Sequence, residues 1–278
     1  MIILGMRRSG TSLVASLAES LGFFFEKDSR SPDQHNPRGY FESRTLDNMN
    51  TGILSELGGD THSPPSLREG WQELPAIRKL QGEATRMLSE YSKHEKWGLK
   101  GSKLCLTLPF WKPLFESEMY YLLCVRNPLA TARSWKKMAH ALQINLATES
   151  WYTFMAHALV NTANERRLLV YYEDFAEDAK SQTSKICDFL GLRTEKELSY
   201  LYSQDLERNR VTPLDLANET LIPDKVKMLY ALLLEAKSNP SILSYLDQTF
   251  KGYSGPHPPW RVRLRYRMRS IGRTMIRK

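Results

Sequence analysis

The sequence has no apolar run of the roughly 20 residues that a membrane-spanning helix needs. It also lacks a secretory signal pattern, because Met1 leads into a short apolar stretch that Arg7 and Arg8 soon interrupt. Hydrophobic residues make up 41% and charged residues 25% of the 278 positions, as in an ordinary globular protein. The composition therefore predicts one globular domain with a substantial core, and no leader segment.

Cysteine is scarce, and the chain shows no spacing typical of a metal site. The three cysteines, Cys105, Cys124 and Cys187, each lie in apolar surroundings. We therefore expect buried free thiols in a reducing compartment, which predicts a cytoplasmic protein. No resident metal ion is expected.

Acidic residues are absent from the last part of the chain, residues 256–278, which contains seven arginines and one lysine. This tail carries a formal charge of +8, equal to that of the whole chain, so residues 1–255 are neutral overall. We predict a globular domain over 1–255 and a basic tail over 256–278. Arginine alternates with apolar residues in 260–269, and the stretch 260–278 fits peripheral contact with an anionic membrane or an acidic partner. A solvated end is the alternative, and the neutral body argues against a nucleic-acid partner.

Short apolar stretches alternate with helical patterns along the chain. This order predicts an α/β fold, with a central parallel β-sheet flanked by helices. Ligands of such sheets bind at the carboxyl ends of the strands, where charged residues follow three of the predicted strands. The predicted strands are 1–5, 97–99, 119–125 and 168–172, and the predicted helices are 11–21, 43–57, 74–91, a helix from 128, a helix ending at 190 and most of 194–250.

The stretch GMRRSGTS, residues 5–12, has the glycine spacing of a phosphate-binding loop but lacks its lysine. In nucleotide triphosphatases this lysine follows the second glycine and contacts the β- and γ-phosphates. Here Thr11 stands in its place, and the positive charge lies inside the loop at Arg7 and Arg8. No apolar strand ends in an aspartate for Mg²⁺. Backbone N–H groups and a helix N-terminus still predict an anion site, with an arginine-bearing surface turn as the alternative.

A second motif, CVRNPLATARSW, covers residues 124–135. Arg126 stands where a strand ends, and Pro128 suits the first position of the next helix. Ser134 follows Arg126 by eight residues, about two helical turns along the chain. An arginine and a hydroxyl placed this way could bind one phosphate together.

These two motifs resemble those of sulfotransferases that use 3′-phosphoadenosine 5′-phosphosulfate (PAPS). In that family a basic residue precedes Ser-Gly-Thr, as Arg8 precedes residues 9–11, and an arginine at a strand end is followed eight positions later by a serine. Residues 168–192 also resemble the family's strand, Tyr-Glu-Asp and helix segment. The resemblance covers residues 1 to about 192, and it implies a P-loop-like sulfotransferase fold for the globular domain.

The resemblance implies that PAPS donates a sulfuryl group, that 3′-phosphoadenosine 5′-phosphate (PAP) is the product and that transfer needs no metal. It assigns the phosphosulfate to the opening loop, the 3′-phosphate to Arg126 and Ser134, and the adenine to Tyr172. A core position is the alternative for Tyr172. The residues implied to contact the donor are Arg7, Arg8, Ser9, Gly10, Thr11, Ser12, Arg126, Ser134 and Tyr172.

Glu42 is the predicted base for the acceptor, with Arg8 and Lys100 as further catalytic residues. Glu42 lies in NPRGYFES, residues 36–43, which resembles a stretch found in bacterial members of the family. Tyrosylprotein sulfotransferases, which belong to the same family, use a glutamate as the base. The alternatives for Glu42 are that it caps the next helix or pairs with Arg7 or Arg38. His35 is a weaker candidate for the base.

The stretch KGSK, residues 100–103, departs from the family pattern. Some cytosolic members have a histidine base where Ser102 stands, and many bacterial members have Lys-Asp-Pro-Arg over these four positions. The remaining histidines, among them His62, His140 and His157, have no motif around them and are expected on the surface or in polar contacts.

Two other functions stay open, as does the acceptor. A kinase or hydrolase of the phosphate-loop class would need the missing lysine and Mg²⁺ aspartate. A nucleotide-binding protein without catalysis would fit the altered stretch 100–103. The acceptor is expected to be a small molecule, a carbohydrate or a lipid. Residues 23–25 and Trp71 could line its pocket or belong to the core, and the basic tail could also close over the donor's 3′-phosphate.

Overall fold

The computed structural model describes residues 1–26, 39–139, 142–193, 198, 201–202 and 211–255. Within this part of the chain, four parallel strands form one sheet in the order β2–β1–β3–β4. The strands are β1 (Ile2–Leu4), β2 (Leu99–Lys100), β3 (Tyr121–Val125) and β4 (Arg167–Tyr171). The predicted α/β fold with a central parallel sheet is confirmed.

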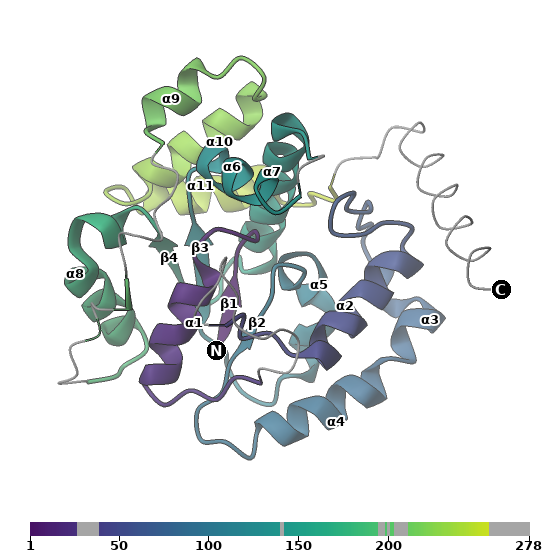
Figure 1. Ribbon diagram of the computed structural model, residues 1–278. Coiled ribbons are helices and arrows are strands. Elements are labelled where there is room, and N and C mark those ends of the chain that lie inside the picture. The colour runs from purple at the N-terminus through teal and green to yellow at the C-terminus, as the bar shows by residue number, and fades with distance from the viewer. Residues whose placement is uncertain (27–38, 140–141, 194–197, 199–200, 203–210, 256–278) are drawn as a thin grey trace.

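Helices cover both faces of this sheet (Figure 1). Alternate strand residues point to opposite faces, so Ile3 and Leu122 pack against one helical layer while Ile2 and Leu123 pack against the other. The first layer contains α1 (Thr11–Ser20) and α8 (Asp174–Phe189). The second contains α5 (Leu104–Trp111), α7 (Ile144–Asn161), α10 (Asp224–Glu235) and α11 (Ser241–Phe250). Burial on both faces explains why the strands read as continuous apolar runs.

The remaining elements pack against the core of the second layer. They are α2 (Arg44–Glu56), α3 (Pro75–Arg78), α4 (Gln81–Tyr91), α6 (Pro128–Lys136), α9 (Pro213–Asn218) and 3₁₀ turns at Trp71–Glu73 and Lys112–Leu114. None of the helices in the described ranges is both long and apolar enough to span a bilayer. Residues 256–278 lie outside the described residues, so the predicted boundary at residue 255 stays a prediction.

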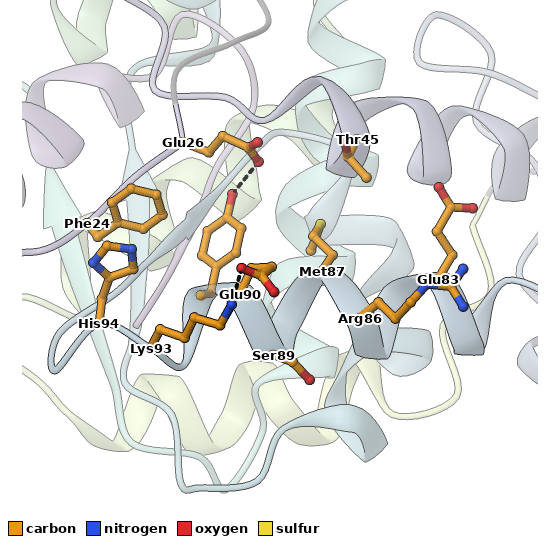
Figure 2. Close-up of a pocket in the computed structure, with 11 residues that line it drawn as sticks. Phe24, Glu26, Thr45, Glu83, Arg86, Met87, Ser89, Glu90, Lys93 and His94 are labelled. Carbon is orange, nitrogen blue, oxygen red and sulfur yellow. Dashed lines mark hydrogen bonds and ion pairs between the residues drawn. The ribbon is translucent and has the colours of Figure 1, made fainter.

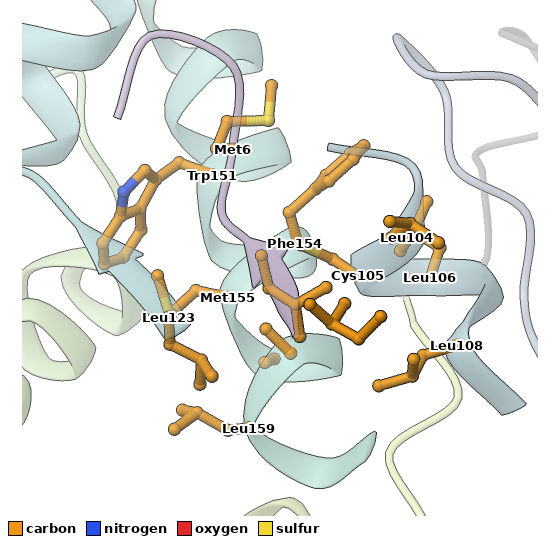
Figure 3. Packing of buried hydrophobic residues seen from close by; sticks show 14 of the residues in the cluster. Met6, Leu104, Cys105, Leu106, Leu108, Leu123, Trp151, Phe154, Met155 and Leu159 are labelled. Carbon is orange, nitrogen blue, oxygen red and sulfur yellow. The ribbon is translucent and has the colours of Figure 1, made fainter. Parts of the chain in front are cut away.

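Helix α5 was not predicted from the sequence, because it is apolar on every side and contains Pro109. A proline in a helix cannot donate a hydrogen bond to the carbonyl four residues earlier, which here belongs to Cys105. The side chain of Asn161, at the end of α7, donates to that carbonyl at 2.9 Å instead. Figure 3 shows α5 and α7 side chains packed around Met6 and Leu123, beneath the loop that follows β1. The surrounding core thus stabilises a helix that its own sequence disfavours.

The predicted helix over 74–91 was wrong as a single element. The chain forms α3 and α4 with a bend at 79–80 between them. The bend lets Ile77 of α3 and Met87 of α4 both join the core cluster that includes α5 and α7. Tertiary packing therefore outweighs the continuous helical pattern.

Candidate active site

The loop between β1 and α1 is shaped by its two glycines. Gly5 has a φ of 151° and Gly10 a φ of 91°. A Cβ on Gly5 would lie 2.9 Å from the carbonyl oxygen of Cys124, and a Cβ on Gly10 would lie 2.5 Å from the ring of Tyr172. Both positions therefore require glycine, because the backbone is left-handed and the neighbouring atoms are already in contact. The loop backbone packs directly on the ends of β3 and β4.

Arg8 joins this loop to the second motif. Its Nε donates a hydrogen bond to Oγ of Ser134 at 3.0 Å, and its carbonyl oxygen accepts one from Nη1 of Arg126 at 2.9 Å. Arg8 also has a φ of 71°, a conformation that costs a residue with a side chain about 1–3 kcal/mol. The structure thus brings together the arginines and the serine that the sequence placed in two separate motifs.

Two hydrogen-bond donors, one in this loop and one at the end of β3, are buried without partners among the described residues. Ser9 is 1% exposed, and the described part of the chain offers its Oγ no hydrogen-bond partner. The same holds for Nε of Arg126, whose guanidinium lies 4.1 Å from the centre of the Tyr172 ring. Buried donors normally have an acceptor, so these two atoms are suited to an anionic ligand. Thr11 is buried at the start of α1, whose N-terminus faces the loop.

Asn127 and Glu173 hold the ends of β3 and β4 together. The side chain of Asn127 caps α6 by accepting from the N–H of Leu129 at 2.9 Å, and the backbone N–H of Asn127 donates to Oε1 of Glu173 at 2.8 Å. Burial raises the pKa of the Glu173 carboxyl above its ordinary value. Asp174 forms an ion pair with Lys237. Glu173 and Asp174 therefore both have structural partners.

Glu42 forms an ion pair with Lys100 beside the loop. Nζ of Lys100, at the end of β2, donates to Oε1 of Glu42 at 2.8 Å, to the carbonyl of Tyr40 at 2.7 Å and to Oγ of Ser12 at 3.2 Å. The side chain of Lys100 is 4% exposed, whereas that of Glu42 is 25% exposed. Lys100 therefore connects the candidate base to the start of α1 while leaving one edge of the carboxylate accessible.

The alternatives for Glu42 can now be compared with its contacts. Ser43, not Glu42, caps α2 by accepting from the N–H of Leu46 at 3.2 Å. The ion pair of Glu42 is with Lys100, and Arg7 lies with its guanidinium 4.9 Å from the Trp135 ring centre. His35 and Arg38 lie outside the described residues. The sequence did not predict the Glu42–Lys100 pair, because no local pattern relates residues 58 positions apart.

A second ion pair, which the sequence did not predict, joins Lys103 to Asp47, a few residues after Lys100 and Glu42 in the same two segments. Nζ of Lys103 donates to Oδ1 of Asp47 at 2.6 Å and to Oγ1 of Thr51 at 2.7 Å. Asp47 and Thr51 lie four residues apart on α2, which places them on one face. The three-residue spacing of Lys100 and Lys103 was visible, but their partners could not be inferred from it.

Two histidines without motifs have different surroundings. His62 is exposed and stacks on Trp135 with ring centres 5.2 Å apart, and burial and the charge of Arg7 lower its pKa. His157 is buried, which lowers its pKa to about 4. The expected surface or polar position was therefore wrong for His157, which lies on the inner side of α7 against Tyr253. His140 lies outside the described residues.

The aromatic residues considered for an acceptor pocket belong elsewhere. Phe25 and Trp71 are buried in the core, and Phe23 is partly buried against the cluster formed by α1 and α8. Phe24 pairs through its backbone with Trp97, at the amino edge of the sheet, opposite the loop. There it borders a groove of about 570 Å³ along α4, where Figure 2 shows Phe24 beside His94. This groove is separate from the candidate active site.

The chain is similar in sequence to known sulfotransferases. A model of the sulfotransferase domain matches residues 1–228. Sulfotransferase 2A2 of Rattus norvegicus is 29% identical over 135 residues, which cover 41% of this chain and 47% of that protein. Sulfotransferase 2A6 of Mus musculus is 32% identical over 142 residues, covering 43% and 50%. The 3-alpha-hydroxysteroid sulfotransferase of Cavia porcellus is 29% identical over 136 residues, covering 41% and 46%.

The chain spans about half the length of the curated relatives it matches. Among solved structures, it is similar to the sulfotransferase domain of the Synechococcus PCC 7002 olefin synthase, with 20% identity, a TM-score of 0.45 and coverage of 92% of this chain and 94% of that domain. The sulfotransferase domain of the curacin biosynthetic pathway gives 19% identity, a TM-score of 0.42 and coverage of 92% and 98%. Since the family model covers most of the 278 residues, the chain belongs to the sulfotransferase domain family.

Proposed function

We propose that this protein transfers the sulfuryl group of PAPS to a hydroxyl or amine of an acceptor. The observation that carries the proposal is the meeting of two anion-binding motifs at Arg8, which contacts Ser134 and Arg126 at once. Membership in the sulfotransferase domain family supports the same donor. A nucleotide with two well-separated phosphates suits such a site better than a single triphosphate chain.

The two motifs divide the donor's phosphates between them. The loop N–H groups, Ser9 and the start of α1 would bind the 5′-phosphosulfate, with Arg7, Gly10, Thr11 and Ser12 forming the rest of this cradle.

Arg126 and Ser134 would bind the 3′-phosphate. Ser134 accepts a hydrogen bond from Arg8 in this structure. In the complex its hydroxyl would donate to the 3′-phosphate, and Arg8 would then be available to bind the phosphosulfate. The partly exposed ring of Tyr172, stacked on Arg126, is the proposed contact for the adenine.

Transfer would proceed by in-line attack of the acceptor oxygen on sulfur. A new S–O bond forms as the bond from sulfur to the 5′-phosphate oxygen breaks, and Glu42 takes the proton of the acceptor hydroxyl. Arg8 and the loop N–H groups stabilise the charge that develops on the leaving phosphate. A sulfuryl group carries less charge than a phosphoryl group, so Arg8 and the loop N–H groups would stabilise this charge without a metal ion.

Lys100 positions the base. Its contact with Glu42 orients the carboxylate, and its contact with Ser12 fixes that carboxylate relative to the loop that holds sulfur. A base must lie within hydrogen-bond reach of the proton it removes, so this link between donor loop and base would matter for rate rather than for donor affinity.

Binding of PAP and of ATP, each with and without Mg²⁺, tests the donor assignment by calorimetry. We expect PAP to bind tightly with no effect of Mg²⁺, and ATP to bind more weakly. A preference for ATP that depends on Mg²⁺ would contradict the proposal and favour a kinase or hydrolase. PAP binding without transfer from PAPS to any acceptor would instead favour a nucleotide-binding protein without catalysis.

We further propose that residues 1–255 form the catalytic domain, that the acceptor is a small molecule, a carbohydrate or a lipid, and that residues 256–278 contact an anionic membrane or an acidic partner. The support for the tail is its charge of +8. Removing 256–278 should abolish binding to vesicles that contain phosphatidylserine and leave PAP affinity unchanged. A loss of PAP affinity would show that the tail serves the donor site.

A further inference from the structure

The Asp47–Lys103 pair extends the polar surface that begins at the candidate base. Lys100 and Lys103 flank the turn between β2 and α5, and each reaches across to the segment 40–51. The first lysine binds Glu42 and the second binds Asp47 and Thr51. Because β2 ends at Lys100, both pairs lie at the carboxyl edge of the sheet, where ligands of such folds bind.

The second pair is more open to solvent than the first. The side chain of Asp47 is 47% exposed, and Thr51 is also exposed. Lys103 is only 12% exposed, so it holds the carboxylate and the hydroxyl in fixed positions from below. Two oxygen-bearing side chains are thus presented on one face of α2, beside the carboxylate proposed to accept the acceptor's proton.

This surface does not suit a flat apolar acceptor. A steroid ring placed against Glu42, Asp47 and Lys103 would displace water from charged groups without replacing its hydrogen bonds. The sequence's large aromatic candidates do not compensate within the described residues, because Phe25 and Trp71 are in the core and Phe24 lies at the amino edge. A ligand with several hydroxyl groups could replace the displaced water with hydrogen bonds of its own.

We propose that Asp47, Thr51 and Lys103 form an acceptor subsite for a polyhydroxylated acceptor of the saccharide class. Asp47 accepts hydrogen bonds from hydroxyls of the sugar. Thr51, whose hydroxyl donates to the backbone carbonyl of Asp47, accepts one more, and Lys103 keeps both side chains in place. Another hydroxyl of the same ligand then reaches Glu42. This inference rests on the proposed sulfuryl transfer and narrows its acceptor.

The test measures transfer of labelled sulfate from PAPS to two sets of probes. The first set is methyl glucoside, N-acetylglucosamine and its tetramer, and the second is androsterone and 2-naphthol. Asp47→Asn and Thr51→Val are compared with the wild type, and Glu56→Gln is the matched control, since Glu56 is an exposed carboxylate at the far end of the same helix. PAP affinity and Tm are measured for every variant, so that a damaged fold is recognised.

We expect kcat/KM for the saccharides to exceed that for androsterone and 2-naphthol. Asp47→Asn should raise the saccharide KM about tenfold, the loss expected for a hydrogen bond to a charged group, with kcat and PAP affinity nearly unchanged. Thr51→Val should raise the saccharide KM by a few-fold, and Glu56→Gln should leave it unchanged. A KM effect without a change in Tm is a result that a purely structural ion pair would not give.

Three results would overturn the inference while leaving the proposed function intact. They are a preference for androsterone or naphthol, no transfer to any saccharide by protein that binds PAP, and an unchanged saccharide KM in the folded Asp47→Asn variant. Failure to bind PAP would instead refute the proposed function, and with it the acceptor subsite.

Discussion

The donor and acceptor sides of the candidate site are built in different ways. The donor side consists of two continuous stretches, 5–12 and 126–134, in which glycine conformations and buried backbone contacts set the geometry. The acceptor side consists of ion pairs between segments far apart in the chain, Glu42–Lys100 and Asp47–Lys103, with the carboxylates partly exposed. A donor that never changes can be bound by a rigid backbone loop. Exposed side chains on a helix can be replaced one at a time to suit another acceptor.

The largest expected effect separates chemistry from donor binding. Glu42→Gln should lower kcat by about 100- to 10,000-fold, the usual contribution of a general base, because the amide cannot take the acceptor proton. PAP affinity should stay within about twofold, since we propose that Glu42 contacts the acceptor rather than the donor and its ion pair is with Lys100. Single-turnover transfer and calorimetry measure the two quantities. A variant with full turnover would remove Glu42 from the mechanism.

Gly10→Ala should damage the donor side through the backbone. Its new Cβ would lie 2.5 Å from the Tyr172 ring, and the φ of 91° adds strain. We expect a loss of about 2 kcal/mol or more in unfolding free energy and a marked loss of PAP affinity.

The matched control for this glycine is Gly52→Ala on α2, where a Cβ meets nothing within 4 Å. That variant should be more stable by about 0.5–1 kcal/mol, because alanine favours a helix. Urea denaturation compares both variants. If Gly10→Ala were as stable as the wild type and bound PAP normally, the packing of Tyr172 on the loop would not matter for donor binding.

Arg126→Ala should weaken PAP binding about 10- to 100-fold, since it removes a charged hydrogen-bond donor from the 3′-phosphate. Arg133→Ala provides the control, because Arg133 is exposed on the same helix as Ser134 and should not change the affinity. Calorimetric titration with PAP distinguishes them. Equal affinities for the two variants would show that the second motif has been misinterpreted.

The smallest effect is expected for Ser134→Ala. Losing one neutral hydrogen bond should weaken PAP binding about fivefold, and it also releases Arg8 from its present contact at 3.0 Å. The same titration should then show a smaller loss than for Arg126→Ala. An effect larger than that of the arginine would mean that the hydroxyl, rather than the charge, dominates binding of the 3′-phosphate.

The sequence predicted the local structure of the proposed donor side, because the signals for that structure are local. Spacing within residues 5–12 predicted the loop, and a strand end followed by Pro128 predicted the second motif. The acceptor side was predicted only in part. Glu42 was found by resemblance, but its pairing with Lys100 depends on how β2 packs beside α2, which no local pattern encodes. Asp47 resembles any polar residue on the surface of an amphipathic helix, so nothing marked it.

Helix α5 shows the same limit for the fold. Its residues have no helical periodicity because every side is buried, and Pro109 argues against a helix. The compensating bond from Asn161 to the carbonyl of Cys105 joins residues 56 positions apart. Such a contact exists only after the core has formed, so no interpretation of this segment alone could include it.

The position of β1 between β2 and β3 also determines when the site can exist during synthesis. The ribosome releases Arg8 first, yet Arg126 follows 118 residues later and Ser134 follows 126 residues later. At elongation rates of about 5–20 residues per second, the loop waits roughly 6–25 s for its partners. The apolar first strand has no partner until β2 is synthesised and gains its second neighbour only with β3, and nucleotide can assist folding only after the second motif has emerged.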